Sequence, residues 1–600
     1  MMSSIWKFFK RGLLLLLIIS TIYIVNLFWF KPFFINHFYN KIFVEFAYNS
    51  PQMISGMGYK FFYDQLDDNS QAANDKSLQM LKDSYEMLKE YDRTKLEGQA
   101  LISYDILDYF LKDRMDSLVF DDYGYSQSQK GGNYMGIISF MTDNHKIDDV
   151  SDAKDYITRL SQVGTSFDNT LIQVKKEQSN GVIPPDFIIK KLLTNLHNIR
   201  DPELVENELV KDFMGKVDKL EDLDAETKDT LHADLKVQMN QVVLPAYDRM
   251  IAFYEDLLTK SDSRAGVWKF PKGAEYYQHM IKTRTTTDYT PEYLHNLGLK
   301  EVDRIVAQIK NILTQEGYDT NFNTIGKILN DLSKEPQFLY HDSKEGRMQV
   351  IEDYQKIIDE IDAKMGDTFG VLPKGKVEVL PVPEYREQTS AGAYYMRPSM
   401  DGSRPGRFYA NLYDLTATPK FGMRTLAYHE AVPGHHFQLA IQNELKDLPM
   451  FRGFMGFTGF TEGWALYAER LAAELGFTDD PYDNIGRLQA ELFRAVRLVV
   501  DTGIHHGKWS REEAIKYMSE TTGMADTDVE SEIERYVVWP GQALSYKVGM
   551  IKFLELRQKA IDQLGDKYHP KDFHTRVLEN GALPLSLLEQ QVDAYIKEKS

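Results

Sequence analysis

The sequence predicts a mainly α-helical protein with one small β-sheet. Apolar residues recur at helical spacing, for example at Leu81, Tyr85 and Leu88, with charged residues between them, and this period returns as far as about residue 365. Segments in which apolar and polar residues alternate, as they do in β-strands, are confined to about 375–415. We find no internal repeat, low-complexity tract or long linker. One large helical domain therefore fits better than a chain of small ones.

Several of the predicted helices carry start signals. Residues 290–292 read Thr-Pro-Glu, which supplies an N-cap, a proline in the first turn and an acidic first turn. Ser510 and Thr527 each have a glutamate three residues later, which is the spacing of a capping box. These signals predict that helices begin directly after residues 290, 510 and 527.

The predicted sheet depends on two segments. In residues 376–383, Val377 and Val379 alternate with polar neighbours, as in a half-buried strand. Residues 407–412 form the second predicted strand. The segment 399–406 between them is rich in Gly, Pro, Ser and Asp, which favours a turn.

Composition and charge narrow the class of protein. Of the 600 residues, 43% are hydrophobic and 26% are charged, which is ordinary for a folded protein. The net charge is −19 and no basic stripe offsets it, so we expect no nucleic-acid binding. The chain has no cysteine, which excludes disulfides, thiolate zinc sites and an acyl-cysteine lipid anchor. Any metal site must use His, Asp or Glu.

The N-terminus carries one membrane-length segment. Residues 13–30 are largely apolar and uncharged, and as a helix they span roughly 27 Å, close to the thickness of a bilayer core. Basic residues precede this run between Lys7 and Arg11, and only Lys31 closely follows it. The positive-inside rule then leaves the N-terminus in the cytoplasm and places the rest in the periplasm or outside the cell.

We therefore predict two parts: a cytoplasmic tip and single transmembrane anchor in residues 1–34, with the lipid bilayer as partner, and a large helical domain in residues 35–600. A cleaved signal peptide is the alternative. The run is long, ends in the aromatic residues Trp29 and Phe30, and lacks a small-residue cleavage site after it, which favours a retained anchor.

The residues with recognisable chemistry lie within about 375–550, and the most informative segment is 428–438, YHEAVPGHHFQ. In the H-E-x-x-H helix of zinc peptidases, two histidines one turn apart bind zinc, and the glutamate beside the first acts as general base. His429 and Glu430 match the first half of this pattern, but Pro433 stands where the second histidine belongs.

A continuous helix would not return a later histidine to the same metal. His435 would lie about 240° around the helix from His429, and His436 would lie about 10.5 Å further along it. Pro433 lacks the N–H that bonds to the preceding turn, and Gly434 tolerates unusual dihedral angles. The sequence therefore predicts a helix break that brings one of the two histidines back beside His429. His435 is favoured, because it needs a smaller distortion of the helix than His436.

A third ligand is predicted in residues 461–469, TEGWALYAE, where Glu462 lies on a second helix. Two histidines and a carboxylate leave a fourth position for water, whose pKa zinc lowers to about 7. We expect one Zn²⁺ per chain, bound by His429, Glu462 and either His435 or His436. The alternative is a surface His-Glu pair and a glutamate that caps a helix.

Three motifs together resemble a known family. H-E-x-x-P-G-H-H-x-Q at 429–438, E-G-W-A-x-Y-x-E at 462–469 and P-G-Q-A-x-x-Y-K-x-G at 540–549 are similar to the bacterial domain of unknown function 885 family, which is grouped with the gluzincin zinc metallopeptidases. Segments within 285–298 and 500–505 extend the resemblance. It implies a gluzincin-like architecture in which the small β-sheet lies beside the active-site helix, with the same zinc ligands.

Further residues are candidates for catalysis or substrate binding. Tyr546 would donate its hydroxyl to the oxyanion of a tetrahedral intermediate, as a tyrosine does in similar helical zinc peptidases, or else is a core residue. His505, next to His506, would supply a second donor or bind a substrate carboxylate, or else caps a helix end. The remaining candidates for contacting a peptide are Arg404, Arg535, Lys547, Tyr394, Tyr395 and Tyr409.

The sequence thus predicts a membrane-anchored zinc metallopeptidase that hydrolyses oligopeptides, with Glu430 as the base that deprotonates water. Two alternatives stay open: a zinc hydrolase of a non-peptide amide or ester, and a catalytically inactive envelope protein that binds or scaffolds. The choice between exopeptidase and endopeptidase, the substrate preference and the oligomeric state are not readable from the sequence.

Overall fold

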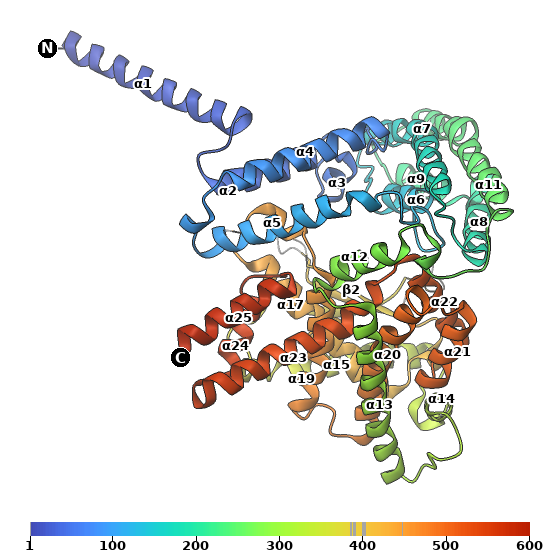
Figure 1. Cartoon of the computed structure of the whole chain (residues 1–600). Helices are drawn as coiled ribbons and strands as arrows, with labels where there is room; N and C mark the ends of the chain where they lie inside the picture. Colours follow the sequence, from blue (N-terminus) through green and yellow to red (C-terminus); the bar gives the residue numbers. More distant parts are fainter. Residues whose placement is uncertain (1, 384–386, 388–391, 399–403, 447) are drawn as a thin grey trace. The chain divides into compact units, whose positions relative to one another are not determined.

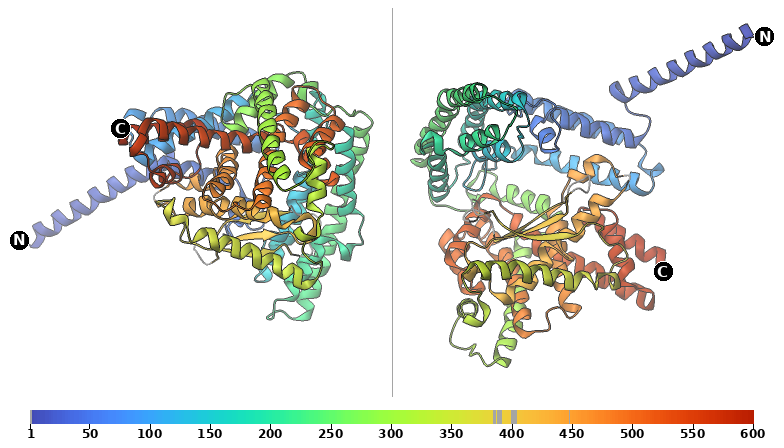
Figure 2. Two further views of the ribbon diagram at one scale, coloured as in Figure 1. Left: turned by 90° about the horizontal axis from the view of Figure 1, so that it is seen from below. Right: turned by 180° about the vertical axis from the view of Figure 1, so that it is seen from behind.

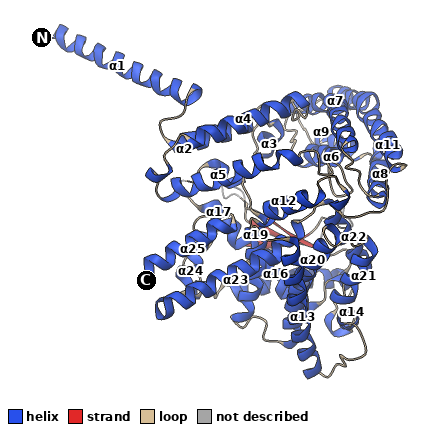
Figure 3. Ribbon diagram, viewed as in Figure 1, coloured by secondary structure: helices blue, strands red, loops and turns tan. Residues whose placement is uncertain are grey.

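The computed structural model describes residues 2–383, 387, 392–398, 404–446 and 448–600 (Figure 1). Helices dominate, and among the described residues three short strands form a single sheet (Figure 3). The predicted mainly α-helical fold with one small sheet is confirmed.

The chain divides into two compact units: residues 1–262 with 448–454, and residues 263–447 with 455–600. This division falls inside residues 35–600, which were predicted to form one domain. Amphipathic helices precede and follow Asp262 without a long linker between them, so the pattern gives no sign of the division.

The first unit is built from helices whose apolar faces form a core around α7. Tyr156, Phe167 and Tyr247 are fully buried in this core. In the described chain one helix, at Trp6–Trp29, is long and apolar enough to cross a membrane, and it lies within α1. The helices of this unit are α1 (Met2–Trp29), α2 (Ile35–Tyr48), α3 (Pro51–Gly56), α4 (Gln71–Lys89), α5 (Gly98–Ser117), α6 (Asn133–Asp143), α7 (Val150–Ser179), α8 (Asp186–Arg200), α9 (Glu208–Asp218), α10 (Ala225–Gln238), α11 (Leu244–Leu258) and α18 (Met450–Phe454).

The second unit combines helices with the sheet and holds all the motif residues. Helix α16 packs against both α19 and α20, while α13 packs along α20 and α23 along α19. The helices are α12 (Gly273–Thr285), α13 (Pro291–Gln315), α14 (Ile325–Ser333), α15 (Lys344–Asp362), α16 (Lys420–Glu430), α17 (His435–Glu444), α19 (Thr458–Glu474), α20 (Pro481–His505), α21 (Arg511–Thr522), α22 (Asp526–Val538), α23 (Ser545–Leu564), α24 (Pro570–Leu578) and α25 (Leu585–Lys599).

The sheet has the strand order β1-β3-β2, with β1 (Val377–Pro381) parallel and β2 (Ala393–Met396) antiparallel to β3 (Gly406–Ala410). The alternation of Val377 and Val379 is confirmed, since both are buried. Strand β2 was not predicted, because its sequence AYYM shows no alternation of apolar and polar residues. Most of the turn predicted at 399–406 lies outside the described residues.

Two of the three predicted helix starts are confirmed. The Thr290 hydroxyl accepts the N–H of Tyr293 at the start of α13, and Ser510 begins α21 with the predicted capping box. The box predicted at Thr527 is wrong. Helix α22 begins two residues earlier than predicted, with Ala525 at its N-cap, because acidic side chains already favour its first turn.

Glycines of two motifs bring α19 and α23 into backbone contact. A Cβ atom at Gly463 would lie 2.4 Å from the Cα of Gly549, and a Cβ at Gly549 would lie 2.0 Å from the carbonyl oxygen of Gly459. No side chain fits at these distances. The glycines therefore hold the helix that carries Glu462 against the helix that carries Tyr546.

Candidate metal centre

The predicted helix break is present. Helix α16 ends at Glu430 and α17 begins at His435, so Pro433 and Gly434 lie between two helices. A Cβ atom at Gly434 would lie 1.9 Å from the carbonyl oxygen of His429, which only glycine avoids. This close approach folds the chain back on itself and brings His435 beside His429.

Helix α19 holds the break in place through Trp464. Its indole Nε1–H donates to the carbonyl of Pro433 at 2.9 Å, and the ring is fully buried. Because Trp464 and Glu462 lie on the same helix, one element fixes both the turn and the carboxylate that faces it. The motif at 429–438 and the motif at 462–469 are therefore in direct contact in the fold.

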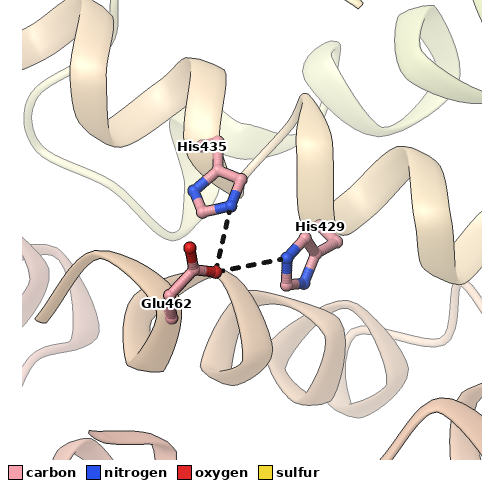
Figure 4. Close-up of side chains that lie close together, drawn as sticks. All are labelled: His429, His435 and Glu462. Atoms are coloured by element: carbon pink, nitrogen blue, oxygen red, sulfur yellow. Dashed lines mark ion pairs between the residues drawn. The ribbon is translucent and has the colours of Figure 1, made fainter. Parts of the chain in front are cut away.

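His429, His435 and Glu462 lie together (Figure 4). Glu462 Oε2 lies 3.4 Å from His435 Nε2 and 3.7 Å from His429 Nε2. Both histidines and the glutamate are mostly buried. The structure thus assembles three of the four predicted ligand candidates, with His435 rather than His436.

The spacing of these atoms fits a cation with tetrahedral coordination. Ligand atoms about 2.1 Å from a tetrahedral zinc ion are about 3.4 Å apart, close to the two separations measured here. Two nitrogens and a carboxylate oxygen leave one position for water or substrate, as in a catalytic site. The donor set therefore fits Zn²⁺.

A second carboxylate orients the first histidine. His429 Nδ1 donates to Glu469 Oε1 at 2.7 Å, which leaves Nε2 for the cluster. Metal-binding histidines are commonly held in this way, because the carboxylate fixes the ring and raises its basicity. Glu469 is almost fully buried, and the guanidinium of Arg494 lies 4.0 Å from it.

The electrostatics of the cluster favour a bound cation. Burial alone disfavours a charged His429 ring, yet hydrogen bonds to Glu462 and Glu469 outweigh it and raise the pKa of His429 to about 9. Burial opposes the charge of Glu462 too, but the two histidines hold its pKa well below the usual range. The cluster thus keeps a buried carboxylate ionised beside two imidazoles.

Glu430 and Tyr546 are the two predicted catalytic residues nearest to this cluster in the chain or in charge: Glu430 directly follows His429, and the charge of Glu462 acts on Tyr546. Glu430 is the last residue of α16, directly after His429, and is half-buried; no hydrogen bond to its carboxylate is found in the described part of the chain. Tyr546 lies in the first turn of α23, where burial and the charge of Glu462 raise its pKa. The guanidinium of Arg497 lies 4.4 Å from the centre of the Tyr546 ring.

His436 has a different position from its neighbour. Its Nδ1 accepts the Tyr395 hydroxyl at 2.9 Å, and its Nε2 donates to the carbonyl of Gly375 at 3.1 Å. Burial lowers the pKa of His436 to about 4, so the ring is neutral. His436 therefore ties α17 to the sheet region and does not join the cluster.

The structure does not support a catalytic role for His505. Its Nε2 donates to the carbonyl of Tyr536 at 2.9 Å and its Nδ1 accepts the N–H of Val267 at 3.2 Å. Burial lowers its pKa to about 4. Both ring nitrogens are already engaged by backbone groups, so His505 joins chain segments and has no donor left for a substrate.

The cationic candidates are engaged within the protein. Lys547 is buried between Glu491, at 2.6 Å, and Glu301, at 3.0 Å. Arg535 pairs with Glu532 at 2.8 Å. Arg404 donates to the carbonyl of Arg397 at 2.7 Å.

The aromatic candidates lie on the sheet. The rings of Tyr394 and Tyr409 stack across β2 and β3 with centroids 4.9 Å apart. Tyr395 binds His436, as described above. A separate pocket of about 420 Å³ lies between α16 and α20, and His429, Glu469, Phe493 and Arg494 are among its lining residues. Of the three cluster residues, His429 lines this pocket.

Trp464, Glu469 and Arg497 were not among the predicted site residues. Glu469 follows Glu462 by seven residues, which is two helical turns, so the spacing alone places both on one face of α19. Asp501 was also missed: it accepts the N–H of Gly541 at 3.1 Å and holds the turn before Tyr546. No sequence signal pairs residues 40 positions apart.

Fold and site together define a mainly helical protein with a buried cluster of two histidines and one carboxylate. Residues 51–592 match the family described as "Bacterial protein of unknown function (DUF885)", and the chain belongs to this family. The predicted family membership is thereby confirmed. No curated protein matches the sequence.

Several solved structures are similar to this chain, including the following two. A candidate lipoprotein from Colwellia psychrerythraea is 34% identical, with a TM-score of 0.89 over 94% of this chain and 99% of that one. A candidate lipoprotein of unknown function from Shewanella oneidensis is 18% identical, with a TM-score of 0.74 over 93% and 99% of the two chains. The second similarity shows the fold alone.

Proposed function

We propose that this protein is a zinc-dependent hydrolase that cleaves peptide bonds of oligopeptides. The observation that carries the proposal is the cluster of His429, His435 and Glu462, in which a carboxylate oxygen lies 3.4 and 3.7 Å from two imidazole nitrogens. Glu430 directly follows one of the three and is free of internal partners in the described part of the chain. Ligands and base thus adjoin, as water activation requires.

His429, His435 and Glu462 would hold the ion. When bound there, Zn²⁺ supplies a Lewis acid that polarises a carbonyl and acidifies water. Glu430 accepts a proton from the attacking water and passes it to the leaving nitrogen. The Tyr546 hydroxyl donates to the developing oxyanion.

Neighbouring residues support these roles. Glu469 holds the His429 ring, and Trp464 holds the turn before His435. The pocket of about 420 Å³ that reaches His429 has the volume of a small-ligand site, and we assign it to a side chain of the substrate.

The N-terminal helix is proposed to anchor this activity in the cell envelope. The relative from Colwellia psychrerythraea is described as a candidate lipoprotein, which suggests an envelope location for that protein. This chain has no cysteine for acylation, whereas α1 carries an apolar run long enough to cross a membrane. A single-pass anchor with a cytoplasmic N-terminus would serve in place of a lipid, with the bulk of the chain periplasmic or extracellular.

The test compares the wild type with Glu430→Gln, using metal analysis and mass spectrometry of a peptide library. We expect one zinc per chain in both proteins, and a loss of turnover on the order of 10²–10⁴-fold in the variant, because the proton acceptor is removed. Glu316→Gln, at an exposed glutamate of the same unit, is the matched control and should change nothing.

Two results would count against the proposal. Near wild-type turnover in folded, zinc-loaded Glu430→Gln would remove the water-activation step. A wild-type protein that binds one zinc but cleaves no peptide of the library would point to the alternatives, a hydrolase of another amide or ester or an inactive binding protein.

A further inference from the structure

The membrane-proximal part of the first unit has an unusual composition. Of the 34 residues from 30 to 63, twelve are aromatic, whereas aromatic residues make up 12% of the whole chain. The segment contains three lysines and one glutamate, so it is net positive in a chain whose net charge is −19. The composition alone resembles the border of a membrane more than a protein surface exposed to water.

Helix α2 is fixed to the last turns of α1 by specific contacts. The Tyr23 hydroxyl lies 2.8 Å from His37 Nδ1, and Lys41 Nζ donates to the carbonyl of Phe28 at 3.0 Å. The Asn26 side chain donates to the carbonyl of Lys31 at 2.7 Å and so fastens the connection between the helices. These contacts set the depth of α2 relative to α1.

That depth is close to the membrane surface. Tyr23 precedes the end of α1, at Trp29, by six residues or about 9 Å along the helix axis. Because α1 carries the proposed membrane span, the residues of α2 that contact its last two turns lie at the level of the lipid headgroups. Figure 2 shows α1 joined to the unit at this end.

The face of α2 that bears these contacts also exposes apolar side chains. Val44 and Tyr48 follow His37 by seven and eleven residues, which returns them to the same helix face. Both side chains, like that of Phe33 before the helix, are more than half exposed. Such side chains are costly to leave in water.

A turn after α2 extends this surface. The Tyr48 ring packs edge-on against Phe62 with centroids 5.0 Å apart, which places the turn at the end of α2. Tyr59 and Phe61 of this turn are also more than half exposed. We call Phe33, Val44, Tyr48, Tyr59 and Phe61 the proximal aromatic surface.

We propose that the proximal aromatic surface docks on the lipid headgroup region of the leaflet at which α1 ends. Aromatic side chains favour this region because their rings are amphipathic, with an apolar body and a polar edge that suit the border between lipid and water. The surface adjoins the anchor through α2, so the same bilayer covers both. The first unit would then lie on the membrane, not at the end of a free tether.

The absence of cysteine makes this proposal testable in the full chain, because each introduced cysteine is unique. Nitroxide labels would be placed at Val44→Cys, Tyr48→Cys and Phe61→Cys in protein reconstituted into nanodiscs that contain anionic lipid. Matched controls are Ile172→Cys and Val205→Cys, which are exposed apolar positions elsewhere in the same unit. Circular dichroism would check the fold of each variant.

We expect labels at the three proximal positions to be accessible to oxygen dissolved in the bilayer and shielded several-fold from a water-soluble nickel complex, with the opposite result at the controls. Equal nickel accessibility at all positions would overturn the proposal. Shielding from both reagents would also overturn it, because another protein chain would then cover the surface. The proposal would also be overturned if the mature chain isolated from cells lacked residues 1–34, because α1 would then not hold the first unit at the membrane. None of these results depends on peptidase activity.

Discussion

Each unit of this protein buries a histidine among charged groups, and the two histidines differ in what surrounds them. In the first unit, His145 Nδ1 accepts from Arg159 at 2.7 Å, and its Nε2 donates to the carbonyl of Asp152 at 3.0 Å. Burial and nearby cations lower its pKa to about 3. In the second unit, His429 lies between two carboxylates, and its pKa is raised.

The comparison teaches that burial alone does not define a metal site. Both rings are almost fully buried and both are firmly held. Cations around His145 repel any metal ion, whereas carboxylates around His429 attract one. The sign of the neighbouring charge therefore separates a structural histidine from a candidate metal ligand, and each of the following predictions tests one part of that difference.

The largest expected effect is on metal binding. His429→Ala should remove the bound zinc and reduce turnover by about 10⁴-fold or more, because a catalytic zinc needs its three protein ligands. His436→Asn and His145→Gln should keep one zinc per chain, since neither ring joins the cluster. Metal analysis after dialysis measures the zinc content of each variant. Zinc retained in His429→Ala would contradict the proposed difference between His429 and His145.

Tyr546→Phe should keep zinc and lose turnover on the order of 10²–10³-fold, because one oxyanion donor is removed. The Arg497 guanidinium lies against the Tyr546 ring, so we expect it to influence turnover by way of the Tyr546 hydroxyl. Arg497→Met should therefore reduce turnover in the wild type but add little to the loss in Tyr546→Phe. A double-mutant cycle on turnover gives the answer, and fully additive losses would contradict the assigned coupling.

Glu469→Gln tests the second carboxylate beside His429. The amide would still contact Nδ1 but would no longer supply negative charge, so we expect zinc affinity to fall about 10–100-fold. Competition with a chromophoric chelator measures the dissociation constant. An unchanged constant would mean that Glu469 holds the ring by shape alone and that charge around His429 matters less than we propose.

Much of the site was predictable because local rules apply to it. Pro433 and Gly434 signal the break, and the place of Glu462 in its motif signals the third member of the cluster. The structural role of His505 was not predictable, because its two backbone partners, Val267 and Tyr536, are distant from it in sequence. Similarly, the short strand β2 forms because β3 offers it a partner, although its own sequence has no strand period.

The choice between His435 and His436 shows the same limit. The sequence favoured His435 because it needs the smaller distortion, and the structure places its Nε2 beside Glu462. What the sequence could not show is why His436 turns away. The Tyr395 hydroxyl and the Gly375 carbonyl, from strand β2 and the segment before β1, already satisfy both of its ring nitrogens.

The smallest effect is a pH dependence that belongs to the first unit. His145 has a pKa of about 3 in the folded chain and about 6.5 when unfolded. The folded state therefore binds fewer protons than the unfolded state between these values, so the stabilising contribution of the neutral ring is present above pH 6.5 and falls as the pH falls. From pH 7 to pH 5 the loss is about 2 kcal/mol.

Burial is the main reason that the pKa of His145 is lowered, and the charged groups facing the ring act in the same direction. Arg159, Lys216 and Lys60 all disfavour a second positive charge there, and the ring has no carboxylate partner. In His145→Gln the amide keeps an acceptor for Arg159 but cannot titrate. Hydrogen exchange of α7 peptides, compared between wild type and variant at each pH, should therefore show the stability of wild type relative to variant falling by about 2 kcal/mol from pH 7 to pH 5. A difference that does not change with pH would mean that the folded His145 is charged, and that burial and the neighbouring cations do not keep its ring neutral.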